Sequence, residues 1–437
     1  MVSNASDRRD IDQRDLVYNE GYEAGGDDLY IASAAGCRMT DLAGNSYIDL
    51  NLGAGTHILG HAHPAIVAAI GAQAGRGTLY IRPNPLAHDM AALMAKAVPH
   101  FGGFVFCNSG AESTMRASRI ARAFSRKNKI AMFSGGWHGA HDMLLVEEDY
   151  GGNASAPRPQ HRPAGIPREL LELLLFLPYN DEHAFELIER HRDELAMVLI
   201  EPSQGSNPRD DVGPFLKRMR EVTRACNVLL GFDEVITGFR LAFGGAQEHY
   251  GIQADLATYG KVVGGGISIG AIGGRKDVME WVRETRDGTG RSVMMGGTFS
   301  ANPLAMAAGC ATLGQLTAGR TTIYPTLNNH GARIKAAVNE LCIDQGIPVR
   351  ATGIGSMFRL IFTDRPIRSR RERDALELPR PIQDRLYADI LARGVHVGAN
   401  RINFLSTAHE AAEIDLVIDA FTGALSEARR AGWLRHG

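Results

Sequence analysis

Short apolar runs alternate with helix-like segments between Phe104 and about Gln315. Four runs rich in Val, Ile, Leu and Phe predict strands, at 105–108, 129–133, 197–202 and 228–235. Because a continuous apolar run suits a strand that is buried on both faces, this alternation predicts an α/β fold with a largely parallel sheet. Ligands of such sheets bind outside the carboxyl ends of the strands. The candidate site residues are therefore the polar residues and glycines that follow the runs: Asn108, Ser109, Gly110, Ser134, Gly135, Gly136, Glu201 and Asp233.

The pattern changes on either side of this central region. Turn-forming residues 43–45 separate two strand-like runs and predict a hairpin. From His63 to about Val98, apolar residues recur at helical spacing, which predicts helix. We expect a large domain of residues 61–315 and a smaller domain built from residues 1–60 and 316–437.

One segment of the central region stands apart by its composition. Residues 146–168 are rich in Gly, Pro and charge, and predict a long mobile loop. Such a loop is either a lid over a site or a solvated insertion without function.

Composition and charge narrow the class of protein. The chain has 437 residues, of which 44% are hydrophobic and 22% charged, as in ordinary soluble globular proteins. The 47 Lys and Arg residues balance 49 Asp and Glu residues, which gives no reason to expect a nucleic-acid partner. No run of about 18 apolar residues and no secretory signal pattern occurs, so we expect no membrane span and a cytoplasmic location. The five cysteines lack metal-ligand spacing, so we expect reduced thiols and no metal site.

Three short segments carry the candidate chemistry, and each has an ordinary structural alternative. Ser109 and Gly110 stand where a strand meets a helix, a position that binds anions but where Ser is equally typical of a helix cap. Asp233 ends a buried strand and needs a partner, which is either a protonated ring nitrogen or a nearby arginine. Lys261 stands among apolar residues and glycines, which favour its neutral, nucleophilic amine, although most lysines are surface residues.

Together the three segments describe a pyridoxal 5′-phosphate (PLP) site. Lys261 would form the Schiff base with the cofactor, and Asp233 would keep the pyridine nitrogen protonated. The backbone around Ser109, Gly110 and Ala111 would bind the phosphate. The sequence therefore predicts a PLP-dependent enzyme in which Lys261 and Asp233 are catalytic residues.

At this point the chain resembles a known family, the class III PLP-dependent aminotransferases, and within it the glutamate-1-semialdehyde 2,1-aminomutase branch. The resemblance runs in order from about residue 36 to residue 415 and implies the type I, aspartate-aminotransferase-like fold. It rests on these segments: GCRMTDLAGNSYIDL, FCNSGAESTMRASRIARAF, GGWHGAHD, GFDEVITGFRLAFGGAQEHYGI, DLATYGKVVGGGISIGAIGGR, GGTFSANPLAMAAG, GIGSMFRLIFT and FLSTAHEAAEID.

The resemblance also implies roles for single residues. Trp137, followed by His138, matches the aromatic residue that stacks on the pyridine ring, and Val235 would pack on the opposite face. Thr298 matches the threonine that reaches the cofactor phosphate of the neighbouring subunit, which implies a homodimer with shared sites. Ala111 departs from the threonine that is usual in the family, so one hydroxyl contact would be missing while the backbone donors remain.

The residues expected to bind substrate depart from the aminomutase branch. Its N-terminal arginine for the substrate carboxylate matches Asn19, and its typical tryptophan matches Ala54. With Glu20 and Glu23 nearby, we expect a wider and more acidic pocket, unless these glutamates belong to a solvated arm. Such a pocket suits a bulky polar acceptor, an oxo-sugar or aminoglycoside of antibiotic biosynthesis.

An amino donor such as glutamate also needs a binding residue. Arg401 is the first candidate and Arg82 the second, and the glutamate that gates the donor arginine in other class III members matches Ser206. We therefore predict transfer of an amino group from an amino-acid donor to a carbonyl acceptor, both small molecules. An aminomutase, a PLP-dependent epimerase and a non-catalytic ligand sensor on the same fold are the alternatives.

Overall fold

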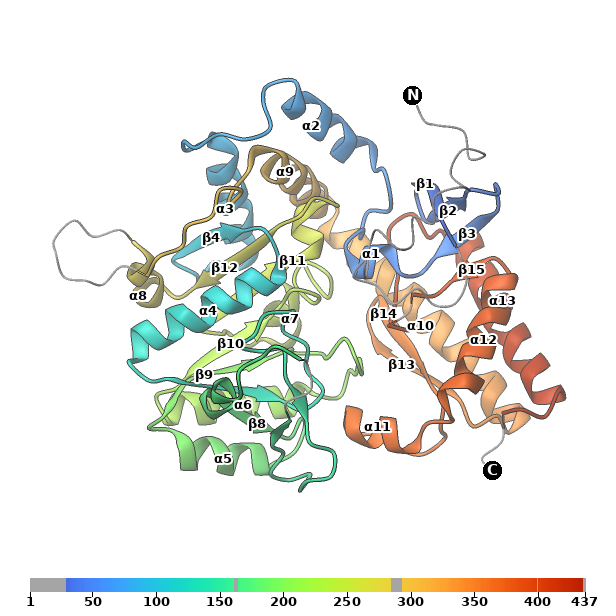
Figure 1. Cartoon of the computed structure of the whole chain (residues 1–437). Helices are drawn as coiled ribbons and strands as arrows, with labels where there is room; N and C mark the ends of the chain where they lie inside the picture. The colour runs from blue at the N-terminus through green and yellow to red at the C-terminus, as the bar shows by residue number, and fades with distance from the viewer. Residues whose placement is uncertain (1–28, 161–163, 284–292, 399, 435–437) are drawn as a thin grey trace.

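Two sheet-containing parts make up the computed structural model of the chain, which describes residues 29–160, 164–283, 293–398 and 400–434 (Figure 1). One part holds a seven-stranded sheet, and the other holds a four-stranded and a three-stranded sheet. In spatial order, the seven strands are β4 (Gly103–Cys107), β12 (Gly270–Gly274), β11 (Leu256–Gly260), β10 (Leu229–Asp233), β9 (Leu195–Ile200), β5 (Lys129–Phe133) and β8 (Leu174–Leu177).

The large sheet is mostly parallel, as predicted. Strands β11, β10, β9, β5 and β8 run parallel to their neighbours, whereas β12 is antiparallel to both β11 and β4. All four predicted strands are present within a few residues of their expected limits. Three further strands, β8, β11 and β12, were not predicted.

Both faces of this sheet are buried. Along β9, Met197 and Leu199 belong to one apolar core, while Val198 and Ile200 belong to the other. Helix α4 (Gly110–Ser125) covers the first face, and α6 (Gly213–Ala225) covers the second. This two-sided burial explains the continuous apolar runs in the sequence.

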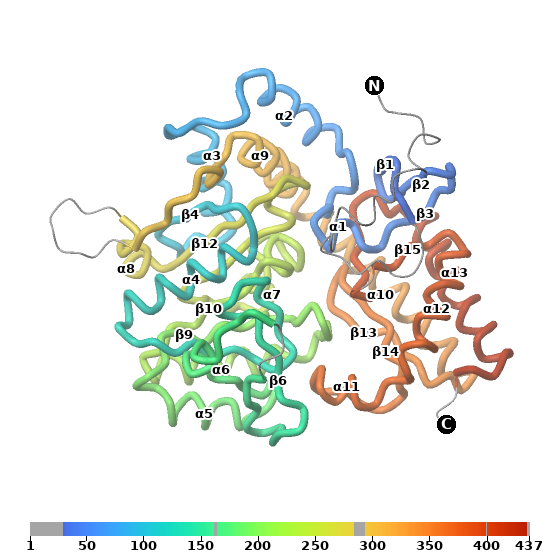
Figure 2. The backbone as a smooth tube through the Cα atoms, viewed as in Figure 1, coloured from blue at the N-terminus to red at the C-terminus, as the bar shows by residue number. Residues whose placement is uncertain are grey.

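The remaining helices surround the sheet or join it to the second part (Figures 1 and 2). They are α1 (Leu52–Gly55), α2 (Pro64–Ala74), α3 (Pro85–Ala97), α5 (His183–His191), α7 (Gly245–Tyr250), α8 (Lys276–Met279) and α9 (Pro303–Ala318), with short 3-10 helices η3 (Arg168–Leu173), η4 (Lys261–Gly264) and η5 (Glu280–Val282).

The helix predicted for the segment from 63 to about 98 is confirmed in part, because the segment is helical at both ends with a break between them. The chain forms α2 and α3, separated by residues 75–84. Gly77 has φ +111, a value that favours glycine, and interrupts the helical backbone. Asn84 then caps α3, because its side chain accepts a hydrogen bond from the Ala87 N–H, and Pro85 occupies the first helical position.

The second part joins the two ends of the chain. Its four-stranded sheet has the spatial order β1 (Ile31–Ala35), β2 (Arg38–Asp41), β3 (Ser46–Asp49) and β15 (Val395–His396). Segments from the N-terminal and C-terminal parts of the chain therefore share one sheet (Figure 2). The β2–β3 pair confirms the predicted hairpin. The other elements of this part are β13 (Arg350–Ile354), β14 (Met357–Ile361), β16 (Asn403–Phe404), α10 (Arg320–Gln345), α11 (Arg370–Leu376), α12 (Arg380–Ala392) and α13 (Ala411–Arg430).

The domain limits at residues 60 and 315 stay predictions. The first lies between α1 and α2, and the second lies in the last turn of α9. Among the helices of the described residues, none combines the length and the apolar composition needed to cross a membrane.

The Gly- and Pro-rich segment contains a short hairpin of β6 (Glu147–Glu148) and β7 (Pro159–Gln160). Arg371 on α11 ties this segment to the second part, since its guanidinium donates to the Glu148 carboxylate at 2.8 Å and to the Tyr150 carbonyl at 2.6 Å. Residues 161–163 lie outside the described residues. The lid role of the segment stays a prediction.

Candidate active site

The turn between β4 and α4 forms an open anion cradle. Ser109 has an extended backbone, and its Oγ accepts a hydrogen bond from the Glu112 N–H at 3.1 Å, which leaves the hydroxyl proton free to be donated. Within the described residues, the N–H groups of Gly110 and Ala111 have no acceptor. These donors and the helix dipole favour a negative charge at this position.

Two glycines let other segments approach this cradle closely. A Cβ atom on Gly110 would lie 2.8 Å from Cγ1 of Val235, on the turn that follows β10. Gly139 has φ +93, and a Cβ atom there would lie 2.5 Å from the Cα of Ala111. The start of α4 therefore packs directly against the segments that carry Asp233 and His138.

Asp233 is held in one orientation at the end of β10. Its side chain is 4% exposed. Oδ2 lies 2.7 Å from Nδ1 of His138, while Oδ1 accepts hydrogen bonds from the Val235 N–H at 3.1 Å and the Thr258 hydroxyl at 3.0 Å. The buried carboxylate thus has the partners that its burial requires, from three different segments.

His138 is the main charged partner of this carboxylate. Burial alone would lower the pKa of His138, but the hydrogen bond to Asp233 and the negative charges of Asp233 and Glu201 outweigh it and raise the pKa. The imidazole is therefore biased toward its charged form, with Nδ1 at hydrogen-bond distance from Asp233. Within the described residues, Nε2 of His138 is buried and has no hydrogen-bond partner.

Glu201 follows β9 and supports the same group of residues. Its carboxylate accepts hydrogen bonds from the Trp137 N–H at 2.8 Å and the Gly205 N–H at 3.2 Å. Burial raises the pKa of Glu201, and the nearby Asp233 charge acts in the same direction, whereas His138 opposes it. The sequence placed Glu201 at a strand end without a role, and the structure shows that it fixes the backbone of Trp137.

Lys261 follows β11 directly and is the first residue of η4. Its φ of +49 is uncommon for a residue with a side chain, and such strain is typical of functional positions. The residue is half-buried, and burial lowers the pKa of its amine to about 8. The carboxylates of Glu201 and Asp233 oppose this shift, while the positive charge of Arg240 assists it. A larger fraction of the amine is therefore neutral near pH 7 than for an ordinary lysine.

Arg240 joins three parts of the chain beneath this site and was missed by the sequence analysis. Its guanidinium is fully buried and donates to the carbonyls of Gly55 at 2.6 Å and Leu405 at 3.1 Å, and to the Ser356 hydroxyl at 3.2 Å. Burial lowers the pKa of Arg240 to about 9. A lone arginine within the apolar run FRLAF was the only local signal.

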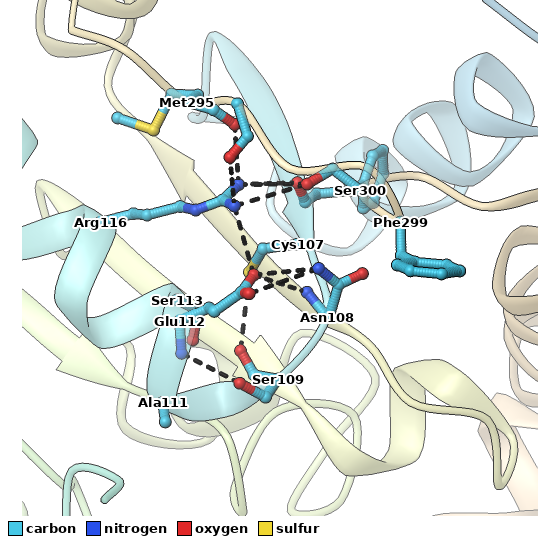
Figure 3. A network of polar contacts seen from close by, with 12 residues as sticks. Cys107, Asn108, Ser109, Ala111, Glu112, Ser113, Arg116, Met295, Phe299 and Ser300 are labelled. Atoms are coloured by element: carbon cyan, nitrogen blue, oxygen red, sulfur yellow. Dashed lines mark hydrogen bonds and ion pairs between the residues drawn. The ribbon is translucent and has the colours of Figure 1, made fainter. Parts of the chain in front are cut away.

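Arg116 joins α4 to the loop before α9, and it was also missed (Figure 3). The side chain is 3% exposed, and its guanidinium donates to the carbonyls of Met295 and Gly296, each at 3.0 Å. It also pairs with Glu112 at 3.2 Å, and Glu112 in turn accepts a hydrogen bond from the Asn108 N–H at 3.0 Å. A continuous polar chain thus connects the anion cradle with residues 295–300.

The other predicted site residues lie outside this buried group. Trp137 and Thr298 are exposed, and Arg82 is exposed between α2 and α3. Arg401 is buried, stacks over the Tyr387 ring at 5.2 Å, and donates hydrogen bonds to the side chains of α12 residues Gln383 and Asp384.

The structure bears differently on each of the residues that the sequence predicted to bind substrate. A carboxylate-binding role for Arg401 would require it to leave its partners on α12 and stays a prediction, as does that of Arg82. Glu20 and Glu23 lie outside the described residues. Ser206, at the gating position, donates to the Gly135 carbonyl at 2.7 Å.

Comparison with known proteins identifies the family. Residues 22–425 match the family model for the class-III aminotransferases. A glutamate-1-semialdehyde 2,1-aminomutase from Methanosarcina acetivorans is 40% identical over 397 residues, which cover 90% of this chain and 91% of the relative.

Solved structures agree with this match. An omega-transaminase from Sphaerobacter thermophilus superposes with a TM-score of 0.88 at 32% identity, covering 98% of this chain and 100% of that chain. A structure described as a transaminase with PLP bound gives a TM-score of 0.83 at 30% identity, covering 95% of this chain and 94% of that chain.

The chain belongs to the class III aminotransferases. It has the type I fold of the PLP-dependent transaminases, it is an enzyme of this class, and its cofactor is PLP. The expectation of an oxo-sugar or aminoglycoside acceptor finds no support, since the relatives are aminomutases and transaminases.

Proposed function

We propose that Lys261 binds PLP covalently and carries the proton during amino transfer, and that Asp233 faces the cofactor ring nitrogen. The observation that supports this most directly is the placement of a poorly solvated amine next to an oriented, buried carboxylate. Asp233 pairs in register with Thr258 on β11, and Lys261 follows that strand immediately. The open N–H groups at the start of α4 fit the phosphate.

When bound, PLP supplies an electron sink that stabilises negative charge on the substrate carbon next to the nitrogen. The chain supplies the proton transfers. With a pKa of about 8, the Lys261 amine is poised to take up a proton from the substrate carbon and to return it nearby. Asp233, oriented by its hydrogen bond with His138, would face the ring nitrogen and favour a proton there, which strengthens the electron sink.

The two faces of the cofactor ring would be covered by Trp137 and Val235. The Glu201 carboxylate holds the backbone of Trp137, and Val235 donates its N–H to Asp233. Both residues would thereby be positioned by the same buried carboxylates that surround Lys261.

We also propose that the enzyme is a homodimer in which Thr298 reaches the cofactor phosphate of the other subunit. Large apolar side chains near this residue are exposed, namely Ile81 at 86%, Met294 at 81% and Phe299 at 58%. The two segments lie side by side, because the Asn84 side chain donates to the Ala301 carbonyl at 3.2 Å. Exposed apolar side chains on adjoining segments are typical of a protein interface, and we call these three residues the apolar patch.

For the reaction, the first candidate is the intramolecular amino transfer named for the aminomutase relatives, from carbon 2 to carbon 1 of glutamate-1-semialdehyde. It is supported by 40% identity over nearly the whole of both chains. The second candidate is transamination between two substrates, supported by the omega-transaminase structure that covers 98% of this chain.

An assay with each substrate class separates the candidates. The holoenzyme is incubated with glutamate-1-semialdehyde alone, and the position of the amino group is followed by NMR. The proposal predicts an amino ketone with the amino group at carbon 1 and the oxo group at carbon 2, with no release of an amine-free dicarbonyl co-product. Turnover only when an amine donor and a keto acid are supplied together would favour transamination and contradict the first candidate.

A further inference from the structure

The loop of residues 295–300 is held by one buried side chain on α4. The Arg116 guanidinium donates to the carbonyls of Met295 and Gly296 at 3.0 Å and lies 3.4 Å from the Ser300 hydroxyl. These contacts lie on both sides of Thr298, which makes no side-chain hydrogen bond among the described residues and is exposed. Figure 3 shows the guanidinium pointing at this loop, with the Phe299 ring turned away from it.

The loop is also built to receive this side chain. A Cβ atom on Gly297 would lie 2.9 Å from an Arg116 guanidinium nitrogen and 2.7 Å from the Ser300 hydroxyl. The φ of Gly297 is not left-handed, so the backbone conformation does not call for glycine. The reason for glycine at this position is the close approach of the two side chains. A larger residue at 297 would have to displace the ends of these two side chains, which are groups that join Arg116 to the loop.

We propose that Arg116 is a positioning residue for the cofactor of the other subunit. By fixing the loop of its own chain, it places Thr298 where the phosphate of the second copy's PLP can bind it. This inference rests on the proposed function and on the proposed homodimer. Arg116 also pairs with Glu112, and Glu112 accepts a hydrogen bond from the Asn108 N–H next to the anion cradle. The alternative is therefore that Arg116 affects PLP binding in its own subunit.

Hybrid dimers separate these two directions of action. Two differently tagged copies are co-expressed and purified over both tags, with Lys261→Ala in one copy so that a single cofactor site remains. The affinity of apo-protein for PLP is then measured from the Lys261-dependent visible absorbance.

The result depends on which copy of the hybrid dimer carries Arg116→Gln, the copy with Lys261 or the copy without it. With Arg116→Gln in the copy that lacks Lys261, the dissociation constant of PLP should rise about tenfold, because a charged donor to the loop is lost. With Arg116→Gln in the copy that keeps Lys261, it should stay within about twofold of the hybrid carrying Lys261→Ala alone. Equal effects in both arrangements, a larger effect in the second, or no effect in either would overturn the proposal.

Two further variants make the test independent of how well Arg116→Gln folds. Gly297→Ala leaves α4 unchanged and should produce the same rise in the first arrangement only. Arg122→Gln is the matched control, because Arg122 lies on the same helix but donates to the Asn128 carbonyl, and it should change nothing. A monomer in solution would overturn the inference while leaving the proposed role of Lys261 intact, whereas a reference hybrid without Lys261-dependent absorbance would overturn both.

Discussion

Lys261 combines an amine of lowered pKa with a left-handed backbone at the end of a buried strand. Burial makes the charged amine unfavourable, and the nearby Arg240 guanidinium adds to this effect. The same residue lies beside two carboxylates, Glu201 and Asp233, which limit the shift. The amine therefore has a pKa of about 8, close to neutral pH. Such a pKa suits a residue that both binds a carbonyl and moves a proton.

The lowered pKa predicts how cofactor capture by apo-protein depends on pH. The second-order rate constant for capture should rise by about tenfold per pH unit below the Lys261 pKa of about 8 and level off above it, because the neutral amine is the nucleophile. Stopped-flow absorbance measures this directly. A rate that continues to rise up to about pH 10, as for an unperturbed lysine, would contradict the account.

The Asp233 carboxylate should matter through its charge more than through its individual hydrogen bonds. Asp233→Asn removes the charge that we propose faces the ring nitrogen, and is expected to lower kcat by about 100-fold or more. Thr258→Val removes one donor to the same carboxylate but keeps the charge, and should cost about fivefold. Steady-state kinetics on the two holoenzymes decides the matter, and comparable losses would refute the role assigned to the charge.

Helix α4 contributes to the candidate site at two positions, its first turn and Arg116. Its first turn carries the N–H groups that we propose bind the phosphate, and Arg116, further along the helix, donates hydrogen bonds to the loop before α9. The segment after β10 packs on the start of the helix through the contact between Gly110 and Val235. A shift of this one helix would therefore disturb several parts of the cofactor site together.

A substitution at the start of α4 tests this packing. Gly110→Ala places a Cβ atom 2.8 Å from Val235 and is expected to weaken PLP binding by about 1–3 kcal/mol, a typical cost of overpacking. Adding Val235→Ala removes the obstructing methyl groups, so the double variant should bind PLP more tightly than Gly110→Ala alone. Calorimetric titration of the apo-proteins provides the comparison, and a double variant that is weaker than both single variants would argue against the contact.

For the whole molecule, the exposed apolar patch of Ile81, Met294 and Phe299 predicts association of two copies. Phe299→Asp places a charge in this patch and should shift the protein from dimer to monomer in sedimentation analysis. Ile343→Asp is the matched control, because Ile343 is 80% exposed on α10, outside the two segments that form the patch, and should leave the dimer intact. A monomeric unmodified protein, or equal effects of both variants, would contradict the proposed interface.

Much of the fold was predictable because its strands are buried on both faces. The runs at β5, β9 and β10 are apolar apart from Lys129 and Asp233 at two of their ends, so the strand positions were predicted from the sequence. Strands β11 and β12, LATYG and GAIGG, contain small residues that allow close packing but give no such signal. The break between α2 and α3 depends on the backbone of Gly77, which helical spacing alone does not reveal.

Ser109, Asp233 and Lys261 could be selected as candidates from the sequence because each stands at or just after a strand end, and their roles stay predictions. Arg116 and Arg240 were missed because their partners are mainly backbone carbonyls distant in sequence, and such acceptors leave no residue pattern. The prediction of an oxo-sugar or aminoglycoside acceptor found no support in the comparisons. The pocket was inferred from Glu20 and Glu23, which lie outside the described residues, and the relatives favour an amino-acid-derived substrate over an oxo-sugar.

The most direct test of the account is to locate the covalent link to the cofactor. The holoenzyme is reduced with borohydride and digested, and the peptide that carries the pyridoxyl group is sequenced by mass spectrometry. The account predicts that the group is on Lys261 and that Lys261→Ala protein carries none. A label on any other lysine, or an unlabelled Lys261 in a protein that retains amino-transfer activity, would contradict it.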